Sequence, residues 1–286
     1  MKRSRKKKKI RRNLLAALCV LFFALALFSA WKIWSIASGY RTAERRYGDL
    51  AGAVVAAAPA EGSVPSPRLE DTAVPEQSDP SVEEGAAEQE QLEQTRESSP
   101  VSVDFEALRA ISGDVVGWIY LPQTAINYPV VQGRNNSFYL DRFIDGQSNM
   151  GGSLFADYAC PSDFSGKNTI IYGHNMKDGS MFALIDDYAD QSFYEQHPVL
   201  YLNTPSANYR VDVFSGFTSD PEGFIYTTSF ASDEDYAAFL RAAVSASEIA
   251  CPVEAGVGDR IVTLSTCTYT DADVRFVLCG KLTEIG

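Results

Sequence analysis

The sequence lacks most of the residue patterns that metal and nucleotide chemistry requires. Its 286 residues include only two histidines, His174 and His197, which excludes a zinc site built on three imidazoles. It has no H-E-x-x-H pair, no G-x-x-x-x-G-K-[ST] loop, no G-x-S-x-G elbow and no C-x-x-C pair. We therefore expect no metal site and no cofactor.

Basic residues are scarce outside the first twelve positions. Residues 1–12 hold nine of the 25 Lys and Arg residues and no acid, so the remainder carries 16 basic against 37 acidic side chains. Phosphate binding needs a basic surface, so we expect no nucleic-acid partner for the body of the chain.

Charge is also absent from Leu14 to Trp31, 18 residues that would span about 27 Å as a helix. Because the basic tip at residues 1–12 precedes this segment, the tip is expected in the cytoplasm and the rest of the chain outside the cell. We predict a single-pass signal anchor over residues 13–36. The alternative is a secretory signal that is cleaved after Ala37; either way the body is exported.

Aromatic residues are missing from residues 61–100, which hold 11 acidic side chains, two arginines and five prolines. Such a composition does not bury enough apolar surface to offset the entropy lost on ordering. We predict that residues 37–100 form a disordered acidic linker, an extended spacer that holds the next domain off the membrane.

Residues 101–286 have the composition of one folded domain, in which short apolar runs alternate with turn residues. The runs predict strands at 117–121, 128–131, 153–155, 169–172, 199–202, 209–214, 260–264 and 275–278. Asp104 is placed to cap a short first helix, Ser180 to open a second, and Ser232 with Asp235 to form a capping box for a third. Many short strands at this spacing indicate a barrel or a sandwich.

Four cysteines lie outside the apolar segment, at spacings that match no disulfide framework. Three are expected to be small buried residues, with a disulfide among them left open: Cys160, Cys251 and Cys279. Cys267 differs because it ends a strand-like run, where a side chain is held but can reach solvent. A hairpin would place Arg275 across from it, where a guanidinium can lower the thiol pKa or hold an oxyanion. The alternative for Arg275 is a salt bridge to Asp271 or Asp273.

His174 follows the apolar run 169–172 directly and precedes Asn175. A histidine in such a turn is poised for chemistry, and a Cys–His pair is a standard device for activating a thiol. The alternative is a structural histidine, and His197 is expected on the surface.

These motifs together resemble the sortases, the cysteine transpeptidases of Gram-positive cell surfaces. The likeness is carried by T-L-S-T-C ending at Cys267, by Arg275 downstream and by Y-G-H-N upstream. Residues 127–132 and 168–182 resemble class B members in particular, and the likeness extends over residues 103–282. It implies a mostly β fold: a closed barrel of about eight strands, with N-terminal helices and a long helix between strands six and seven.

The resemblance also implies a mechanism. The Cys267 thiolate would attack the carbonyl of a Thr in a sorting-signal peptide, Arg275 would support the oxyanion, and His174 would protonate the leaving amine. An amine of a peptidoglycan precursor or a pilin would then resolve the thioester, which conserves the bond energy without a nucleotide. Some class B members have an acid directly after the cysteine, whereas this chain has Thr268.

Five further positions match the family's peptide contacts. Tyr172 and Ser265 match through the two motifs, Asn136 and Leu140 fit an N-x-x-x-L element, and Tyr226 lies in the loop before the long helix. Each has an alternative role in the core or in a hydrogen-bonding scaffold.

Other classes of exported protein fit the sequence less well. An L,D-transpeptidase has its histidine next to the cysteine, whereas His174 and Cys267 are 93 residues apart. An NlpC-type cell-wall peptidase has its cysteine before its histidine. A non-catalytic adhesin explains the anchor and the linker but gives Cys267, His174 and Arg275 no role. We therefore predict a membrane-anchored transpeptidase whose catalytic domain is extracellular.

Overall fold

The computed structural model describes residues 2–58, 97–267 and 274–286; the side chains of residues 2–12, 14, 16 and 267 lie outside this description. The chain forms two compact units, Met1–Tyr47 and Gly48–Gly286.

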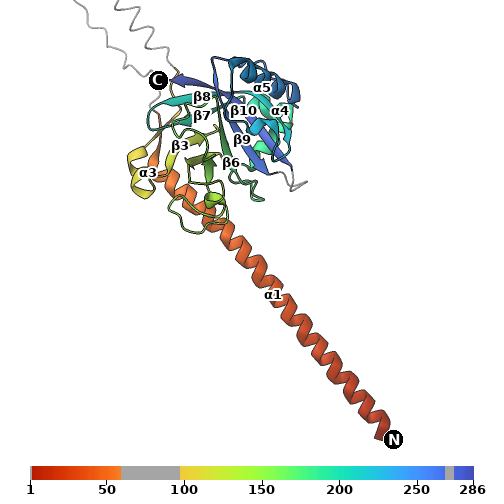
Figure 1. The fold of residues 1–286 in the computed structure, drawn as a ribbon. Helices are drawn as coiled ribbons and strands as arrows, with labels where there is room; N and C mark the ends of the chain where they lie inside the picture. The colour runs from red at the N-terminus through yellow and green to blue at the C-terminus, as the bar shows by residue number, and fades with distance from the viewer. Residues whose placement is uncertain (1, 59–96, 268–273) are drawn as a thin grey trace, which may run out of the picture. The chain divides into compact units, whose positions relative to one another are not determined.

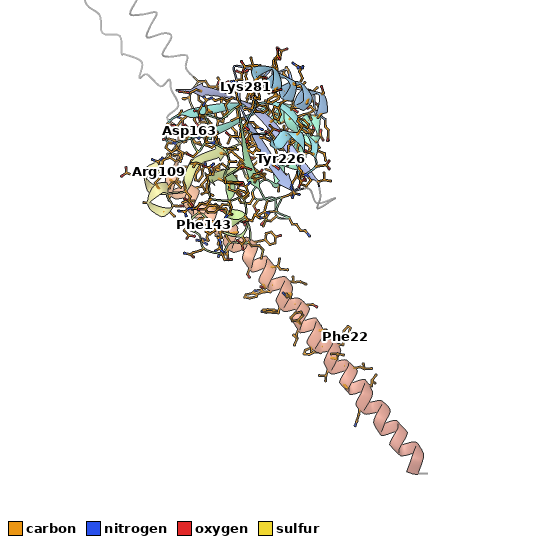
Figure 2. The ribbon with its side chains drawn as sticks, viewed as in Figure 1. Phe22, Arg109, Phe143, Asp163, Tyr226 and Lys281 are labelled. Atoms are coloured by element: carbon orange, nitrogen blue, oxygen red, sulfur yellow. The ribbon has the colours of Figure 1, made fainter. Side chains whose placement is uncertain are left out.

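Helix α1 (Lys2–Val54) contains the apolar segment. The described apolar side chains of that segment are exposed, Phe22 among them at 76 % (Figure 2), and the helix is long and apolar enough to cross a membrane. The helix continues past residue 36, where the linker is predicted to begin. Residues 37–54 are rich in alanine and contain no proline, the first of which is Pro59, so nothing in this stretch interrupts helical hydrogen bonding.

A short two-stranded sheet joins the two ends of the acidic stretch. Strand β1 (Val55–Ala57) pairs antiparallel with β2 (Val101–Val103), and the Ala58 N–H donates to the Pro100 carbonyl over 3.0 Å. The two ends of the acidic stretch therefore lie side by side. Residues 59–96 themselves lie outside the described residues.

Eight strands close into a barrel in the order β10-β8-β7-β3-β4-β5-β6-β9, with β9 paired to β10 (Figure 1). Their bounds are β3 (Val115–Tyr120), β4 (Asn127–Val131), β5 (Leu154–Ala156), β6 (Asn168–Gly173), β7 (Val199–Asn203), β8 (Asn208–Ser219), β9 (Arg260–Cys267) and β10 (Arg275–Ile285). The β4–β5 and β6–β9 pairs are parallel, and the other pairs are antiparallel. The predicted closed eight-stranded barrel is confirmed.

Two of the three predicted helix starts are confirmed by their caps. Asp104 accepts the Ala107 N–H over 2.9 Å and begins α3 (Phe105–Ile111). Ser232 accepts the Asp235 N–H over 3.1 Å and begins α5 (Asp233–Ala246). Helix α5 lies between β8 and β9, the sixth and seventh barrel strands, as predicted.

The predicted helix start at Ser180 is wrong. The Ser180 hydroxyl and N–H both donate to Asp178, and Met181 has a left-handed φ of 57° that does not continue a helix. A 3₁₀ helix, η2 (Ala183–Ala189), begins three residues later and leads into α4 (Gln191–Gln196).

Helix α5 covers one side of the barrel with an aromatic cluster. Tyr236, Phe239 and Leu240 pack against Phe214 of β8 and Val277 of β10, all of them buried. Each large apolar side chain buried in this way contributes about 1.5–3 kcal/mol. Packing of α5 therefore stabilises the strands β8, β9 and β10 on this side of the barrel.

Candidate active site

The hairpin of β9 and β10 places Arg275 directly opposite Cys267. The two residues are Cα partners in the antiparallel register of these strands, which confirms the pairing predicted from the spacing. The Cys267 backbone ends β9, and its side chain lies outside the described atoms. The alternative partners of Arg275, Asp271 and Asp273, lie outside the described residues, as does Thr268.

A second pairing brings the His174 segment to the same end of the barrel. Strand β6 runs parallel to β9, with Tyr172 opposite Ser265 and Gly173 opposite Thr266. Because the strands are parallel, His174 follows β6 where Cys267 ends β9. Two segments 93 residues apart in sequence are therefore neighbours here.

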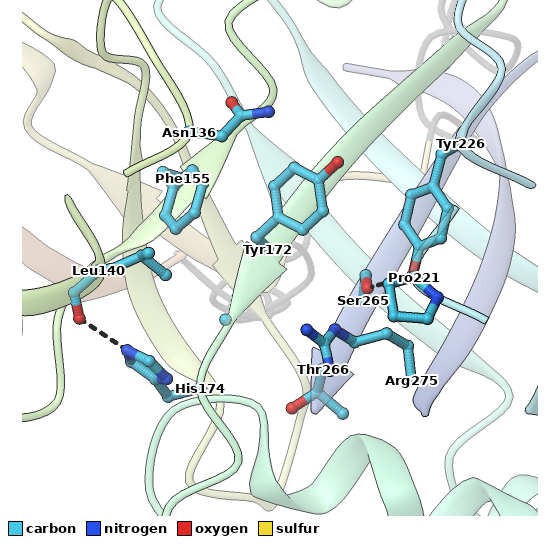
Figure 3. Close-up of a pocket in the computed structure, with 11 residues that line it drawn as sticks. Asn136, Leu140, Phe155, Tyr172, His174, Pro221, Tyr226, Ser265, Thr266 and Arg275 are labelled. Carbon is cyan, nitrogen blue, oxygen red and sulfur yellow. Dashed lines mark hydrogen bonds between the residues drawn. The ribbon is translucent and has the colours of Figure 1, made fainter. Parts of the chain in front are cut away.

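A cavity of about 300 Å³ opens at this end of the barrel (Figure 3). It is lined by Asn136, Leu140, Phe155, Tyr172, Gly173, His174, Pro221, Tyr226, Ser265, Thr266 and Arg275. Every predicted site residue with a described side chain is in this lining. The Arg275 side chain reaches from β10 toward the middle of the lining residues (Figure 3). The second histidine, His197, is the C-cap of α4 and does not line the cavity.

His174 is oriented by the backbone of the neighbouring loop. Its Nε2 lies 2.6 Å from the carbonyl oxygen of Leu140, a residue of the 3₁₀ helix η1 (Phe138–Asp141) (Figure 3). A carbonyl only accepts, so Nε2 carries the hydrogen in this contact and Nδ1 remains for proton exchange. Leu140 is predicted as a peptide contact, and its carbonyl adds a second role that no side-chain pattern reveals.

Two glycines allow this arrangement. A Cβ on Gly173 would meet the side chain of Leu154 and lie 2.5 Å from the ring of Phe182. Gly152 has a left-handed φ of 59°, and a Cβ there would meet the carbonyl of Leu140, the group that holds His174. Both positions therefore require glycine for close approach.

Tyr172 forms the back of the cavity between two other aromatic rings. Its ring is 5.3 Å from that of Phe155 and stacks on Tyr226 at 6.2 Å with an interplanar angle of 14°. The Tyr226 and Ser265 hydroxyls are 2.9 Å apart and form a hydrogen bond. Burial, with the charge of Asp157 adding to it, raises the pKa of Tyr172, so its hydroxyl stays protonated.

The turn that carries Tyr226 is fastened by a buried asparagine. The side-chain amide of Asn168 donates to the carbonyls of Ile225 and Thr227 over 2.9 and 3.0 Å, on either side of Tyr226 in η3 (Phe224–Tyr226). Its oxygen accepts the Thr263 hydroxyl over 2.8 Å. Asn168 thus joins β6, β9 and η3, a role that the sequence analysis missed.

Asn136 is part of the hydrogen-bonding scaffold as well as of the lining. Its amide donates to Asp157 over 2.7 Å, and its oxygen accepts the Tyr158 N–H over 3.0 Å. The sequence analysis also missed Asp157, which accepts the Tyr172 hydroxyl over 2.9 Å. Its one sequence signal is an acid directly after β5, at the end of a strand.

The other cysteines of the domain are poor nucleophiles. Cys160 and Cys279 are buried as predicted, Cys251 is half-buried, and all three are free. Burial raises the thiol pKa of each, that of Cys279 to about 12. Within the described residues, no group of three His, Cys, Asp or Glu side chains is arranged to hold a metal ion.

The loop after His174 is hydrogen-bonded to a half-buried carboxylate, that of Asp186. The Asn175 side chain donates to Asp186 Oδ2 over 2.6 Å, while Asp186 Oδ1 is buried and has no partner among the described atoms. Burial raises the pKa of Asp186 to about 6; the charge of Asp187 adds to the shift, and the Asn175 hydrogen bond opposes it.

Comparison with known proteins places the same residues in a known family. The model of the sortase domain family matches residues 119–283. Sortase B of Staphylococcus aureus is 36% identical over 197 residues, which cover 68% of this chain and 81% of that protein. Sortase B of Listeria monocytogenes is 36% identical over 191 residues, 66% of this chain and 77% of that protein.

Solved structures agree with the sequence relatives. The Staphylococcus aureus sortase B–substrate complex matches with a TM-score of 0.61 and 37% identity, over 64% of this chain and 85% of that one. A Clostridium perfringens sortase B structure matches with a TM-score of 0.60 and 29% identity, over 63% of this chain and 100% of that one.

We predict that Gly173→Ala destabilises the domain by about 1–3 kcal/mol, because the new methyl group meets two buried side chains. Urea unfolding of residues 48–286 measures the change. Gly113→Ala is the matched control, since a Cβ there has nothing within 4 Å. Equal unfolding free energies for the two variants would contradict the close packing at Gly173.

A second prediction concerns Asp186, whose folded-state pKa of about 6 exceeds the value of about 3.9 in unfolded chains. The folded state therefore loses stability relative to the unfolded chain as the pH rises from about 4 to about 6. Asp186→Asn removes this loss, so it should stabilise the domain more at pH 7.5 than at pH 4.

Urea unfolding at the two pH values measures the difference. Glu195→Gln, at an exposed position on α4, controls for removing one negative charge. A pH-independent effect of Asp186→Asn would show that Asp186 does not titrate as described.

Proposed function

Because this chain belongs to the sortase family of cell-wall cysteine transpeptidases, we propose that its cavity receives a sorting-signal peptide, which Cys267 cleaves after a threonine. The acyl group passes first to the Cys267 sulfur and then to an amine acceptor. The acceptor is an amine of a peptidoglycan precursor or of a pilin.

The proposed first step forms a thioester. The Cys267 thiolate adds to the threonine carbonyl, and the developing oxyanion is met by the Arg275 guanidinium. The C–N bond then breaks, and the leaving amine takes a proton from His174. The second step runs in reverse order: His174 accepts a proton from the incoming amine, the amine attacks the thioester, and the Cys267 thiolate leaves.

One observation carries this proposal: three neighbouring strands bring the three residues to one end of the barrel. Arg275 is the Cα partner of Cys267, and β6 delivers His174 beside the end of β9 through the Gly173–Thr266 pair. The cavity in front of them is lined by polar groups from both sides. Holding a nucleophile, an acid–base group and a cation around one point is what acyl transfer requires.

The cavity suits a peptide in an extended form. It has an aromatic back formed by Phe155, Tyr172 and Tyr226 and polar groups on Asn136 and Ser265. The similar Staphylococcus aureus protein is described as a complex with its substrate. We assign the same kind of ligand to this cavity, with Leu140 and Tyr226 at its two sides.

Helix α1 is the proposed membrane anchor. Sortases are cell-surface enzymes, and α1 contains one apolar segment preceded by nine basic residues. This order puts the N-terminus in the cytoplasm and the barrel outside. The proposed acyl transfer gives Cys267, His174 and Arg275 a role that a non-catalytic adhesin would not give them.

We predict that a peptide fragment can be trapped on Cys267. The protein is incubated with short peptides of the L-P-x-T-G and N-P-x-T-x types, and intact-mass spectrometry followed by peptide mapping locates the adduct. Cys267→Ala should form no adduct, and Arg275→Ala should form it about 10²–10³-fold more slowly, because the oxyanion loses its cation.

Cys251→Ala is the matched control, since it removes a half-buried thiol outside the cavity and should leave the adduct unchanged. An adduct on another cysteine, or turnover by Cys267→Ala at the wild-type rate, would contradict the proposal.

We also predict that the mature chain keeps its N-terminus and sediments with membranes. Protease added to intact cells should digest the barrel and spare an epitope placed before Lys2. N-terminal sequencing of the membrane fraction checks the alternative directly. A mature chain that begins at Ser38 would show a cleaved secretory signal instead.

A further inference from the structure

Behind the cavity wall lies a carboxylate that takes no part in the proposed chemistry. Asp157 directly follows β5 and is 9% exposed. Its Oδ2 accepts two hydrogen bonds from residues that line the cavity, the Tyr172 hydroxyl over 2.9 Å and the Asn136 amide over 2.7 Å. Its Oδ1 accepts the Ala159 N–H over 2.9 Å.

The backbone of Asp157 is fixed as firmly as its side chain. Its N–H donates to the Ile170 carbonyl of β6 over 2.9 Å. Its carbonyl accepts the Cys160 N–H over 3.0 Å and the side-chain amide of Gln132 over 2.8 Å. Gln132 also donates to the Cys160 carbonyl, so the turn from 157 to 160 is closed on itself. The carboxylate is therefore held in place before any ligand arrives.

Among the described residues, hydrogen bonds are what meets the charge of Asp157. In the part of the chain that the structure describes, Asp157 forms no ion pair with a lysine or an arginine. A buried carboxylate in this condition depends on its donors, and each donor is oriented by it in return. The raised pKa of Tyr172 fits this arrangement, because a phenolate next to Asp157 would place two negative charges together.

The contacts determine which hydrogen-bonding groups remain for a ligand. The Tyr172 hydrogen points to Asp157, so the phenolic oxygen can only accept from a ligand. Asn136 has one amide hydrogen occupied by Asp157 and one lone pair of its oxygen occupied by the Tyr158 N–H, so one N–H remains to donate. Asp157 therefore fixes Tyr172 as an acceptor and leaves an Asn136 N–H as a donor at the cavity.

We propose that Asp157 is a positioning residue for peptide binding, which holds Tyr172 as an acceptor and Asn136 as a donor toward the bound signal peptide. This inference rests on the proposed function, because it takes the cavity as the peptide site. Asp157 does not contact Cys267, His174 or Arg275 through any hydrogen bond described, so it acts on binding and not on the acyl-transfer step.

The test is steady-state kinetics of Asp157→Asn in the full-length protein in detergent, with a fluorescent N-P-x-T-x peptide and an amine acceptor. Asparagine has one acceptor oxygen for three donors, so the Tyr172 hydroxyl and the Asn136 amide lose their fixed orientation. KM should rise about tenfold while kcat stays within about twofold, the pattern of lost ground-state binding. The rate at which iodoacetamide alkylates Cys267 should not change.

Asp114→Asn is the matched control. The Tyr139 hydroxyl donates to Asp114 over 2.7 Å, the same kind of tyrosine–carboxylate bond outside the cavity lining. This variant should keep the wild-type KM and kcat. An equal effect of Asp114→Asn and Asp157→Asn would assign the loss to general destabilisation and overturn the proposal.

A double-mutant cycle separates positioning from mere stability. Tyr172→Phe removes the hydroxyl that Asp157 orients, so Asp157→Asn should raise KM by a smaller factor in that background than in the wild type. Equal factors in both backgrounds would overturn the proposal. If Asp157→Asn does not fold, Asp157→Ser, which keeps an acceptor near the Ala159 N–H, is measured in the same way.

Different results would overturn the role of Asp157 and the transpeptidase function. If the wild type turns over the peptide and Asp157→Asn has the same KM and kcat, the role of Asp157 is overturned and the transpeptidase assignment stands. Peptide binding without turnover is measured by fluorescence anisotropy on Cys267→Ala. If the wild type turns over no peptide and Cys267→Ala binds none, both the proposed function and the role of Asp157 are overturned.

Discussion

The parallel pairing of β6 with β9 is the contact on which the rest of the site depends. It joins two strands far apart in the chain and sets Gly173 opposite Thr266, one residue before the ends that carry His174 and Cys267. A shift of one residue would send every side chain of β6 to the other face of the sheet. Asn168 of β6 stabilises this register, because its side chain bonds to Thr263 of β9 and to the η3 turn in this alignment of the two strands.

The parts of the fold that depend on local sequence could be predicted. The hairpin that pairs Arg275 with Cys267 and the caps at Asp104 and Ser232 each depend on residues a few positions apart. Non-local features could not be derived in this way: the sequence analysis predicts no pairing of β6 with β9, and only the family resemblance assigns His174 and Cys267 to one site. At Ser180 a competing bond to Asp178 overrode the helix signal.

In the site, the sequence identifies the groups that face the cavity and misses the groups behind it. His174, Arg275 and four of the five predicted contact residues belong to recognisable motifs, and Tyr226 is located by its place before the long helix. The Leu140 carbonyl has no side-chain identity to read, and Asp157 and Asn168 are ordinary polar residues until the fold places donors around them. A buried polar residue acquires its role from tertiary contacts, which no single stretch of sequence displays.

The paired strands β1 and β2 hold the two ends of the acidic stretch next to each other. Closing a chain segment between two fixed points costs only about 0.6 kcal/mol more for each doubling of its length. Because Ala57 and Val101 are hydrogen-bonded neighbours, residues between them can be gained, lost or replaced during evolution at little energetic cost. The length and composition of the acidic stretch are then free to diverge while the β1–β2 pair and the barrel stay the same.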